Sequence, residues 1–328
     1  MVNTETTYMG LKLKSPIVVA SSGLTNTISK LQQLENAGAG AVIFKSLFEE
    51  QIHGESNHLL GDSDAYPEAA DYIESYVRQN SLVSYLDLVR EAKREISIPI
   101  IASISCVSTE EWVSFAKQLE GAGADAIELN MFHVPTSRSE NGGDIEQLYV
   151  DMLRKVKAEV SIPIAVKIGF YYTNIIGFVE QLMANGADSV TMFNRFYEPD
   201  INLKTLELTA SEVFSTPAEI RHSLRWIGLT SATLPQLEIA ASTGVHSGDA
   251  VIKQLLAGAQ VVQVCSAVYV HGSQIVAGMN HELKEFMKKW NFKHLEDFRG
   301  RLSYKGMNVQ MYERAQFMRY FSNHPMNF

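Results

Sequence analysis

Cysteine is scarce in this chain. Its 328 residues include only two cysteines, Cys106 and Cys265, and no Cys-x-x-Cys pair. Two thiols so far apart cannot supply the ligands of an iron–sulfur cluster or a zinc site, so we expect the chain to hold no metal of its own. Both cysteines follow apolar segments, where a free thiol commonly acts as a small buried hydrophobe in a reducing compartment.

Long apolar runs and basic clusters are also missing. No apolar run approaches the roughly 18 residues that span a membrane, and residues 1–14 lack the apolar centre of a secretory signal. The formal net charge of −9 argues against a nucleic-acid partner. These absences favour a cytoplasmic protein with a small-molecule substrate, and with neither membrane nor nucleic acid as its partner.

A repeat of short apolar strands and helices runs through the chain, without low-complexity segments or linkers. Strands are expected at 16–21, 41–44, 98–105, 126–129, 164–168, 189–192, 237–241 and 261–265. Helices are expected at 28–37, 72–95, 110–121, 145–159, 177–184, from 216–219 onward, at 249–257 and beyond the last strand. Segments 47–70 and 195–215 are expected to be irregular.

Continuous apolar strands of this kind are buried on both faces of a parallel sheet. Eight of them, each followed by a helix or a crossover long enough to hold one, favour a closed barrel over an open sheet. We therefore predict an α/β protein in which residues 1–328 form one domain, a single (β/α)8 TIM barrel with a small N-terminal hairpin at 9–14.

Residues 237–267 combine two strands with turns of small residues. Ser242-Thr243-Gly244 ends the first strand, and Ser266-Ala267 follows the second. Small residues allow backbone amides to approach a ligand beside a helix start. Two consecutive units of this kind near the end of a barrel chain are typical of a phosphate site. The alternative is that these residues serve only as turns.

Polar residues close several of the apolar strands. Lys45 and Lys167 end two of them, and Asn130 and Asn194 follow two others. Lysine is rarely buried without a partner, so two lysines at one barrel mouth indicate an anionic ligand, or else an ion pair for each with a neighbouring carboxylate. Together with the phosphate-type turn, the lysines favour flavin mononucleotide (FMN), whose ring develops negative charge on reduction.

Eight segments, in their order and spacing, are similar to those of a known family. They are MGLKLKSPIVVASSG (9–23), VIFKS (42–46), IASIS (101–105), GADAIELN (123–130), IAVKI (164–168), TGVHSGDA (243–250), LLAGAQVVQVCSA (255–267) and LEDFRGRLS (295–303). Over nearly its whole length the chain resembles the dihydroorotate dehydrogenase family of FMN-dependent barrels. The resemblance implies an oxidoreductase that oxidises a CH–CH bond, converting dihydroorotate to orotate in pyrimidine biosynthesis or acting on a related cyclic substrate, with hydride transfer to flavin N5.

The resemblance also implies roles for the matching residues. FMN contacts are expected from Ala20, Ser21, Lys45, Ser46, Asn130, Lys167, Thr243, Gly244, Cys265 and Ser266, although the family usually has Gly-Thr at the last pair. Asn130 and Asn194 match residues that contact the substrate. Lys45, Asn130 and Lys167 match residues next to the reacting groups and are expected to take part in catalysis.

The loop after Asn130 departs from the family pattern. The family carries its catalytic base there, a Cys or Ser followed by Pro-Asn, whereas this chain continues Met-Phe-His-Val-Pro. Without a gap, His133 occupies the base position, and histidine is a competent acid or base near neutral pH. Alternatively, His133 only lines the loop. Ser137 and Ser139 are further candidates.

The substrate side departs as well. The family's loop after the second strand, which grips a carboxylate, is replaced by the acidic stretch 54–71. Arg195 follows Asn194, and it either binds an anionic substrate group bidentately or forms an ion pair.

Two other functions stay open at this stage. One is a barrel lyase or isomerase acting on a phosphorylated metabolite, with Lys167 as its reactive amine. The other is a flavin-binding homologue altered in catalysis. A homodimer is common for such barrels by resemblance. Any iron–sulfur relay would come from a separate electron-transfer partner.

Overall fold

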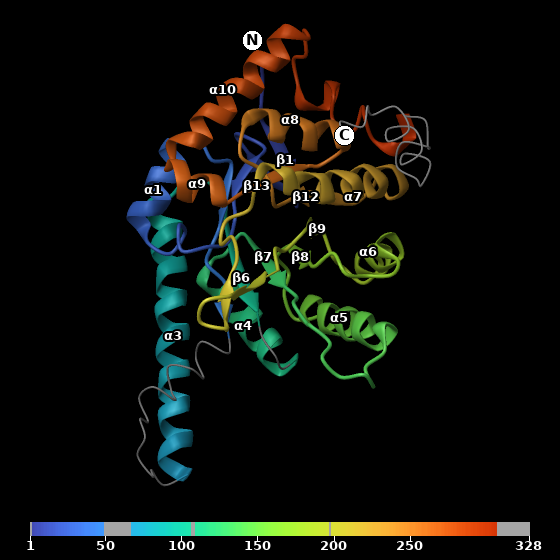
Figure 1. Ribbon diagram of the computed structural model, residues 1–328. Coiled ribbons are helices and arrows are strands. Elements are labelled where there is room, and N and C mark those ends of the chain that lie inside the picture. Colours follow the sequence, from blue (N-terminus) through green and yellow to red (C-terminus); the bar gives the residue numbers. More distant parts are fainter. Residues whose placement is uncertain (1, 49–66, 106–108, 197, 307–328) are drawn as a thin grey trace.

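Eight parallel strands form a closed barrel surrounded by helices (Figure 1). The computed structural model describes residues 2–48, 67–105, 109–196 and 198–306. The barrel strands are β3 (Ile17–Val19), β4 (Ala41–Ile43), β6 (Ile100–Ser105), β7 (Ala126–Asn130), β8 (Ile164–Ile168), β9 (Ser189–Met192), β12 (Glu238–Ala241) and β13 (Val261–Val264). The β13–β3 pairing, with Val264 opposite Val19, and the β4–β6 pairing complete the ring. The predicted (β/α)8 barrel is confirmed.

The helices follow the strands in the expected alternation. They are α1 (Ile28–Asn36), α3 (Pro67–Glu95), α4 (Thr109–Ala122), α5 (Gly142–Lys157), α6 (Ile175–Ala184), α7 (Ile220–Thr233), α8 (Gly248–Ala257), α9 (Ser266–His271) and α10 (Gln274–Lys289). Local signals set their ends. Ser247 caps the start of α8, where its side chain accepts a hydrogen bond from the Ala250 amide, and Gly258 caps the other end with φ 117°. Within the described ranges, no helix is both long and apolar enough to cross a membrane.

Side chains alternate between the two sides of each barrel strand, as the period of two requires. The outward set packs between strands and helices in the main hydrophobic core, for example Ile127, Leu129, Ile164, Val166 and Ile168. The inward set forms a second apolar cluster made of Val18, Ala41, Ile43, Ile101, Ala126, Ala165, Ala240 and Val261. Both sides of the strands are therefore buried, which explains why their sequences are apolar throughout.

An N-terminal hairpin closes the amino-terminal end of the barrel. It pairs β1 (Thr6–Tyr8) with β2 (Leu11–Leu13), and its Tyr8, Met9 and Leu13 belong to the inward cluster. The hairpin was predicted at 9–14, but residues 9 and 10 are its turn, with φ of 51° and 76°. The carboxyl-terminal end of the barrel holds the polar side chains.

The structure differs from the prediction in three further segments. Residues 195–215 contain a hairpin of β10 (Pro199–Asn202) and β11 (Glu207–Ala210); both strands are exposed on both faces, so no buried apolar alternation marks them. Helix α3 begins five residues before its predicted start. The predicted irregular segment 47–70 opens with the short strand β5 (Leu47–Phe48); most of its remainder, like Cys106 and residues 307–328, lies outside the described residues.

Substitution of Gly40 tests the close contact between the backbone before the second barrel strand and the backbone before the first. A Cβ at this position would lie 1.9 Å from the Ser15 carbonyl oxygen, so we expect Gly40→Ala to lower the unfolding free energy by about 2–3 kcal/mol through overpacking. At Gly278 in α10 an added Cβ meets nothing within 4 Å, and Gly278→Ala should raise stability by about 0.5–1 kcal/mol. Urea denaturation measures both; equal stability of Gly40→Ala and wild type would contradict the close approach.

Candidate active site

Two adjoining cavities lie at the carboxyl-terminal end of the barrel. One, of about 470 Å³, reaches Ser215, Thr243, Gly244, Cys265 and Ser266 and is called the turn cavity here. The other, of about 530 Å³, reaches Lys45, Ser46, Ser105 and Asn130 and is called the central cavity. Both are lined by Ser21, Lys167, Asn194 and Arg195. Their volumes fall within the range of about 300–1,000 Å³ common for small-molecule sites.

Serines join the first strands at the central cavity. The Ser46 hydroxyl lies 2.9 Å from the Ser21 hydroxyl and 2.7 Å from the Ser103 hydroxyl, and the Ser46 amide donates to Ser21 Oγ at 2.8 Å. These bonds fix the wall that Ala20 and Ser21 form. Lys45, the neighbour of Ser46, is exposed and lines the cavity.

Asn130 and Asn194 meet across the barrel mouth. Asn194 Nδ2 donates to Asn130 Oδ1 at 2.9 Å. Among the described residues, this leaves the amide nitrogen of Asn130 and the amide oxygen of Asn194 without a hydrogen bond. The Asn130 amide nitrogen as donor group and the Asn194 amide oxygen as acceptor are thus available to a ligand in the central cavity.

Lys167 has a buried carboxylate partner, Glu128. Lys167 Nζ lies 4.0 Å from Glu128 Oε1, and the two side chains are 10% and 1% exposed. Glu128 Oε2 accepts hydrogen bonds from Thr191 Oγ1 at 3.0 Å and from Gln263 Nε2 at 2.8 Å. Glu128 Oε1 makes no hydrogen bond to the described residues. Lys167 therefore takes part in an ion pair and still lines both cavities.

Glu128 is absent from the residues predicted at the strand ends. It lies inside β7, two residues before Asn130, and so faces the barrel interior like Asn130. A charged residue within an otherwise apolar strand is the signal that could have identified it, because a buried charge requires a partner.

Thr243 and Gly244 form a tight turn at the far end of the turn cavity. Both have positive φ, 76° and 77°, and Thr243 Oγ1 donates to the Phe193 carbonyl at 3.0 Å. A Cβ on Gly244 would lie 2.2 Å from the backbone nitrogen of Ile220, the first residue of α7. Only glycine allows this approach, which places the turn beside a helix N-terminus, a favourable position for an anion.

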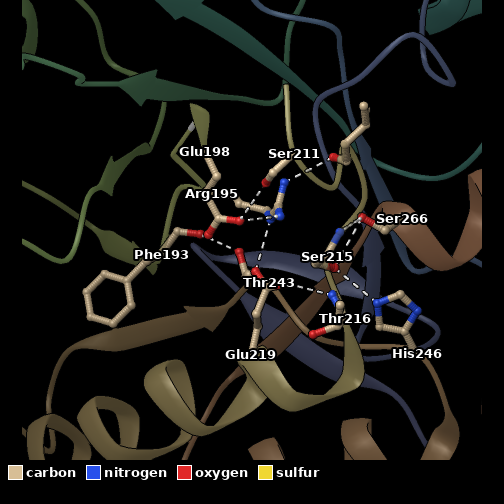
Figure 2. A network of polar contacts seen from close by, with 11 residues as sticks. Phe193, Arg195, Glu198, Ser211, Ser215, Thr216, Glu219, Thr243, His246 and Ser266 are labelled. Carbon is tan, nitrogen blue, oxygen red and sulfur yellow. Dashed lines mark hydrogen bonds and ion pairs between the residues drawn. The ribbon is translucent and has the colours of Figure 1, made fainter. Parts of the chain in front are cut away.

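The segment 211–216, called the strap, lines this end of the site through Val213, Phe214 and Ser215. Figure 2 shows its Ser211, Ser215 and Thr216. The Ser215 amide and hydroxyl both donate to Ser266 Oγ, at 3.0 and 3.1 Å, and the Ser215 hydroxyl lies 3.0 Å from His246 Nε2. Burial lowers the pKa of His246. The strap thus adds polar groups next to the turn.

Arg195 is held by acidic partners rather than left open to a ligand (Figure 2). Its guanidinium contacts Glu219 at 3.0 Å, Glu198 at 3.2 Å and the Val213 carbonyl at 3.1 Å. With two carboxylates satisfying its charge, the geometry favours the ion-pair alternative for this residue.

Cys265 lines the turn cavity and is partly exposed as a residue, so it is less buried than predicted. Desolvation of its thiol nevertheless raises the pKa of Cys265.

The structure does not bring His133 into the central cavity. His133 Nε2 lies 2.8 Å from Glu140 Oε1, the His133 side chain is 40% exposed, and it lines a neighbouring third cavity. Hydrogen bonds from the Ser137 amide and the His133 ring hold the pKa of Glu140 below its usual value. Ser137 and Ser139 bond to each other on the exposed loop. All other predicted site residues line the central or the turn cavity.

Fold and site together define a class of protein: a barrel enzyme with its ligand site at the carboxyl-terminal ends of the strands. The chain belongs to the dihydroorotate dehydrogenase family, whose model matches residues 3–287. This confirms the resemblance predicted from the sequence, and with it a dehydrogenase acting on a CH–CH group.

Relatives align over most of the chain. The catalytic subunit of dihydroorotate dehydrogenase B (NAD(+)) from Thermoplasma volcanium is 28% identical over 310 residues, covering 92% of this chain and 98% of that protein. The subunit of the same name from Anoxybacillus flavithermus is 26% identical over 309 residues, covering 92% and 96%. A putative dihydroorotate dehydrogenase A (fumarate) from Aeropyrum pernix is 25% identical over 303 residues, covering 89% and 94%.

Removal of the Glu128 charge tests the buried pair. We expect Glu128→Gln to lower the unfolding free energy by about 3–5 kcal/mol, since Lys167 keeps its charge without a partner. The double variant with Lys167→Met should recover part of the loss, because neither charge remains. Asp151→Asn, which removes the exposed contact to Arg154, serves as a control and should cost less than about 1 kcal/mol. Additive single-variant effects would contradict the coupling.

The pKa of His246 predicts how acid affects the strap. Since the folded state lowers this pKa below 6.5, the unfolded state takes up the proton more readily, and stability falls as pH drops through that value. When the pH falls from about 7.5 to about 5.5, the thermal unfolding midpoint of wild type should decrease more than that of His246→Gln. Equal losses in the two proteins would rule out a contribution from His246.

Proposed function

We propose that this protein binds FMN across the two cavities and oxidises a CH–CH bond of dihydroorotate or of a related cyclic compound. The observation that carries the proposal is the position of Lys167, which lines both cavities. The turn cavity holds a glycine turn at a helix N-terminus, and the central cavity holds both asparagines of the hydrogen-bonded pair. A phosphorylated cofactor with an electron-accepting ring matches this order of groups.

The residues present fit FMN. Thr243, Gly244, Cys265 and Ser266 would hold its phosphate, since the turn provides backbone amides without a side chain in the way. Ala20, Ser21 and Ser46 would line the ring on a wall already fixed by hydrogen bonds. Bound FMN would supply the acceptor for the substrate hydride.

Lys167 would stabilise negative charge at the polar edge of that ring. The ion pair with Glu128 holds the Lys167 ammonium group in place from the interior of the barrel. Glu128 is fixed in turn by hydrogen bonds from Thr191 and Gln263. Asn130 and Asn194 would orient the substrate through their available donor and acceptor, and Lys45 would add a second positive charge at the rim of the central cavity.

His133 is our candidate for the group that removes the substrate proton. Its contact with Glu140 resembles the carboxylate support that orients a histidine base. The ring faces the neighbouring cavity, so it would have to approach Asn130 when a substrate binds; catalytic contacts commonly tighten only in the complex.

The relatives suggest how electrons leave the protein. Several carry the name catalytic subunit, which implies further subunits in those enzymes. We propose a separate electron-transfer partner for this chain too, because its two cysteines cannot hold an iron–sulfur relay. A cytoplasmic homodimer of single-domain chains remains our proposal for its assembly.

Absorbance spectroscopy tests the cofactor and the substrate in turn. The protein should take up FMN, and Gly244→Ala, with its clash at Ile220, should lose that uptake while keeping its fold by circular dichroism. Anaerobic dihydroorotate should then bleach the bound flavin. A protein that takes up no FMN would contradict the proposal and favour a barrel lyase or isomerase.

The proton acceptor is tested in the same assay. His133→Ala should slow bleaching by about 10²-fold or more if His133 is the base, whereas Ser137→Ala should leave the rate unchanged. Unchanged bleaching in His133→Ala would remove the base assignment. Persistent flavin absorbance in wild type would retain FMN and exclude dihydroorotate as the substrate.

A further inference from the structure

A third cavity, of about 370 Å³, lies beside the central one and is called the aromatic cavity. Its walls come from residues 131–135, from the start of α5, from residues 169–173 and from Phe196. Five phenylalanine and tyrosine rings line it, those of Phe132, Tyr149, Tyr171, Tyr172 and Phe196. Of the residues assigned above to FMN, none lines it.

The rings are arranged as a partly open enclosure. The ring centroid of Phe196 lies 4.7 Å from that of Phe132 and 4.8 Å from that of Tyr171. Phe132 and Tyr171 are 44% and 71% exposed. Gly169 allows Phe196 to lie close to the end of β8, because a Cβ there would meet the Phe196 ring at 2.9 Å. Exposed aromatic side chains gathered around one cavity are typical of a binding site.

A single carboxylate without a charge partner lines this enclosure. Glu146 makes no hydrogen bond or ion pair with the other residues that the structure describes. Burial, the neighbouring Tyr149 and then the charge of Glu146 raise the pKa of Tyr172, another residue of the lining. Within the lining, His133 is the side chain that can become positively charged, and it already contacts Glu140 instead of Glu146.

Aromatic faces and a free carboxylate select the same kind of ligand. The faces of aromatic rings are negative and attract cations, most strongly where water is excluded. A carboxylate on the same cavity adds to that attraction and disfavours an anion. A neutral apolar molecule would use the rings but would leave Glu146 without a partner.

We propose that the aromatic cavity binds a small organic cation, a quaternary or protonated amine with an apolar body. The ammonium group would lie against the ring faces with its charge opposite Glu146. The proposal does not depend on FMN, since no residue assigned to the cofactor lines the aromatic cavity; His133, the proposed proton acceptor, lines it, but choline binding is measured without substrate or turnover.

Isothermal titration with two probes of nearly the same shape tests the proposal. Choline carries a trimethylammonium group, and 3,3-dimethylbutan-1-ol replaces it with an uncharged tert-butyl group. Wild type should bind choline about tenfold or more tightly than the alcohol, from the combined attraction of rings and carboxylate. Equal binding of both probes, or no binding of choline, would overturn the proposal.

Three variants locate the site. Glu146→Gln should weaken choline about tenfold and leave the alcohol unchanged. Glu207→Gln removes the same charge from the exposed strand β11 and should leave choline binding at the wild-type level. Tyr171→Ala, at a largely exposed ring, should weaken choline without affecting the fold. Choline binding that responds equally to the two glutamate changes would reflect net charge alone and would refute the site.

Discussion

The ligand site at the carboxyl-terminal end of the barrel depends on one buried ion pair, Lys167 with Glu128. Lys167 lines both cavities, yet its side chain is only 10% exposed, and the carboxylate of Glu128 beneath it is 1% exposed. An isolated charge at that depth would be strongly unfavourable, so each requires the other. Thr191 and Gln263, from two further strands, complete the coordination of the carboxylate. The cation offered to a ligand is thus fixed by three strands besides its own.

Along the barrel strands, the inward-facing residues are apolar near the hairpin, where they stabilise the fold, and polar at the mouth, where they can contact a ligand. The same inward-facing rows that carry Ala126 and Ala165 near the hairpin continue to Glu128, Asn130 and Lys167 at the mouth. The lower level is apolar and closed by β1 and β2, whereas the upper level is polar and lines the cavities. Substitutions in loops above the barrel can therefore change the ligand while the packing below stays the same.

Much of this arrangement could be predicted from the sequence, because apolar strands and the residues that end them leave local signals. Lys45, Asn130, Lys167 and the Thr243-Gly244 turn were found in this way. The orientation of His133 could not be predicted, since it depends on a contact with Glu140 seven residues away in a loop. Nor could the partners of Arg195, which are Glu198, the Val213 carbonyl in the strap and Glu219 just before α7. The β10–β11 hairpin is exposed on both faces and so lacks the periodic burial that reveals a strand.

The pairing of β13 with β3 links the last strand of the barrel to its first. More than two hundred residues separate Val19 from Val264 in the chain. During synthesis, the seam between them cannot form until the eighth strand has left the ribosome, and contacts this distant in sequence are slow to form. Arg299 adds a later link by donating to Thr6 of the hairpin. The part of the ligand site next to this seam, with Ser21 shortly after β3 and Ser266 shortly after β13, is accordingly the last to be assembled. A truncated chain would expose the unpaired edges of two apolar strands.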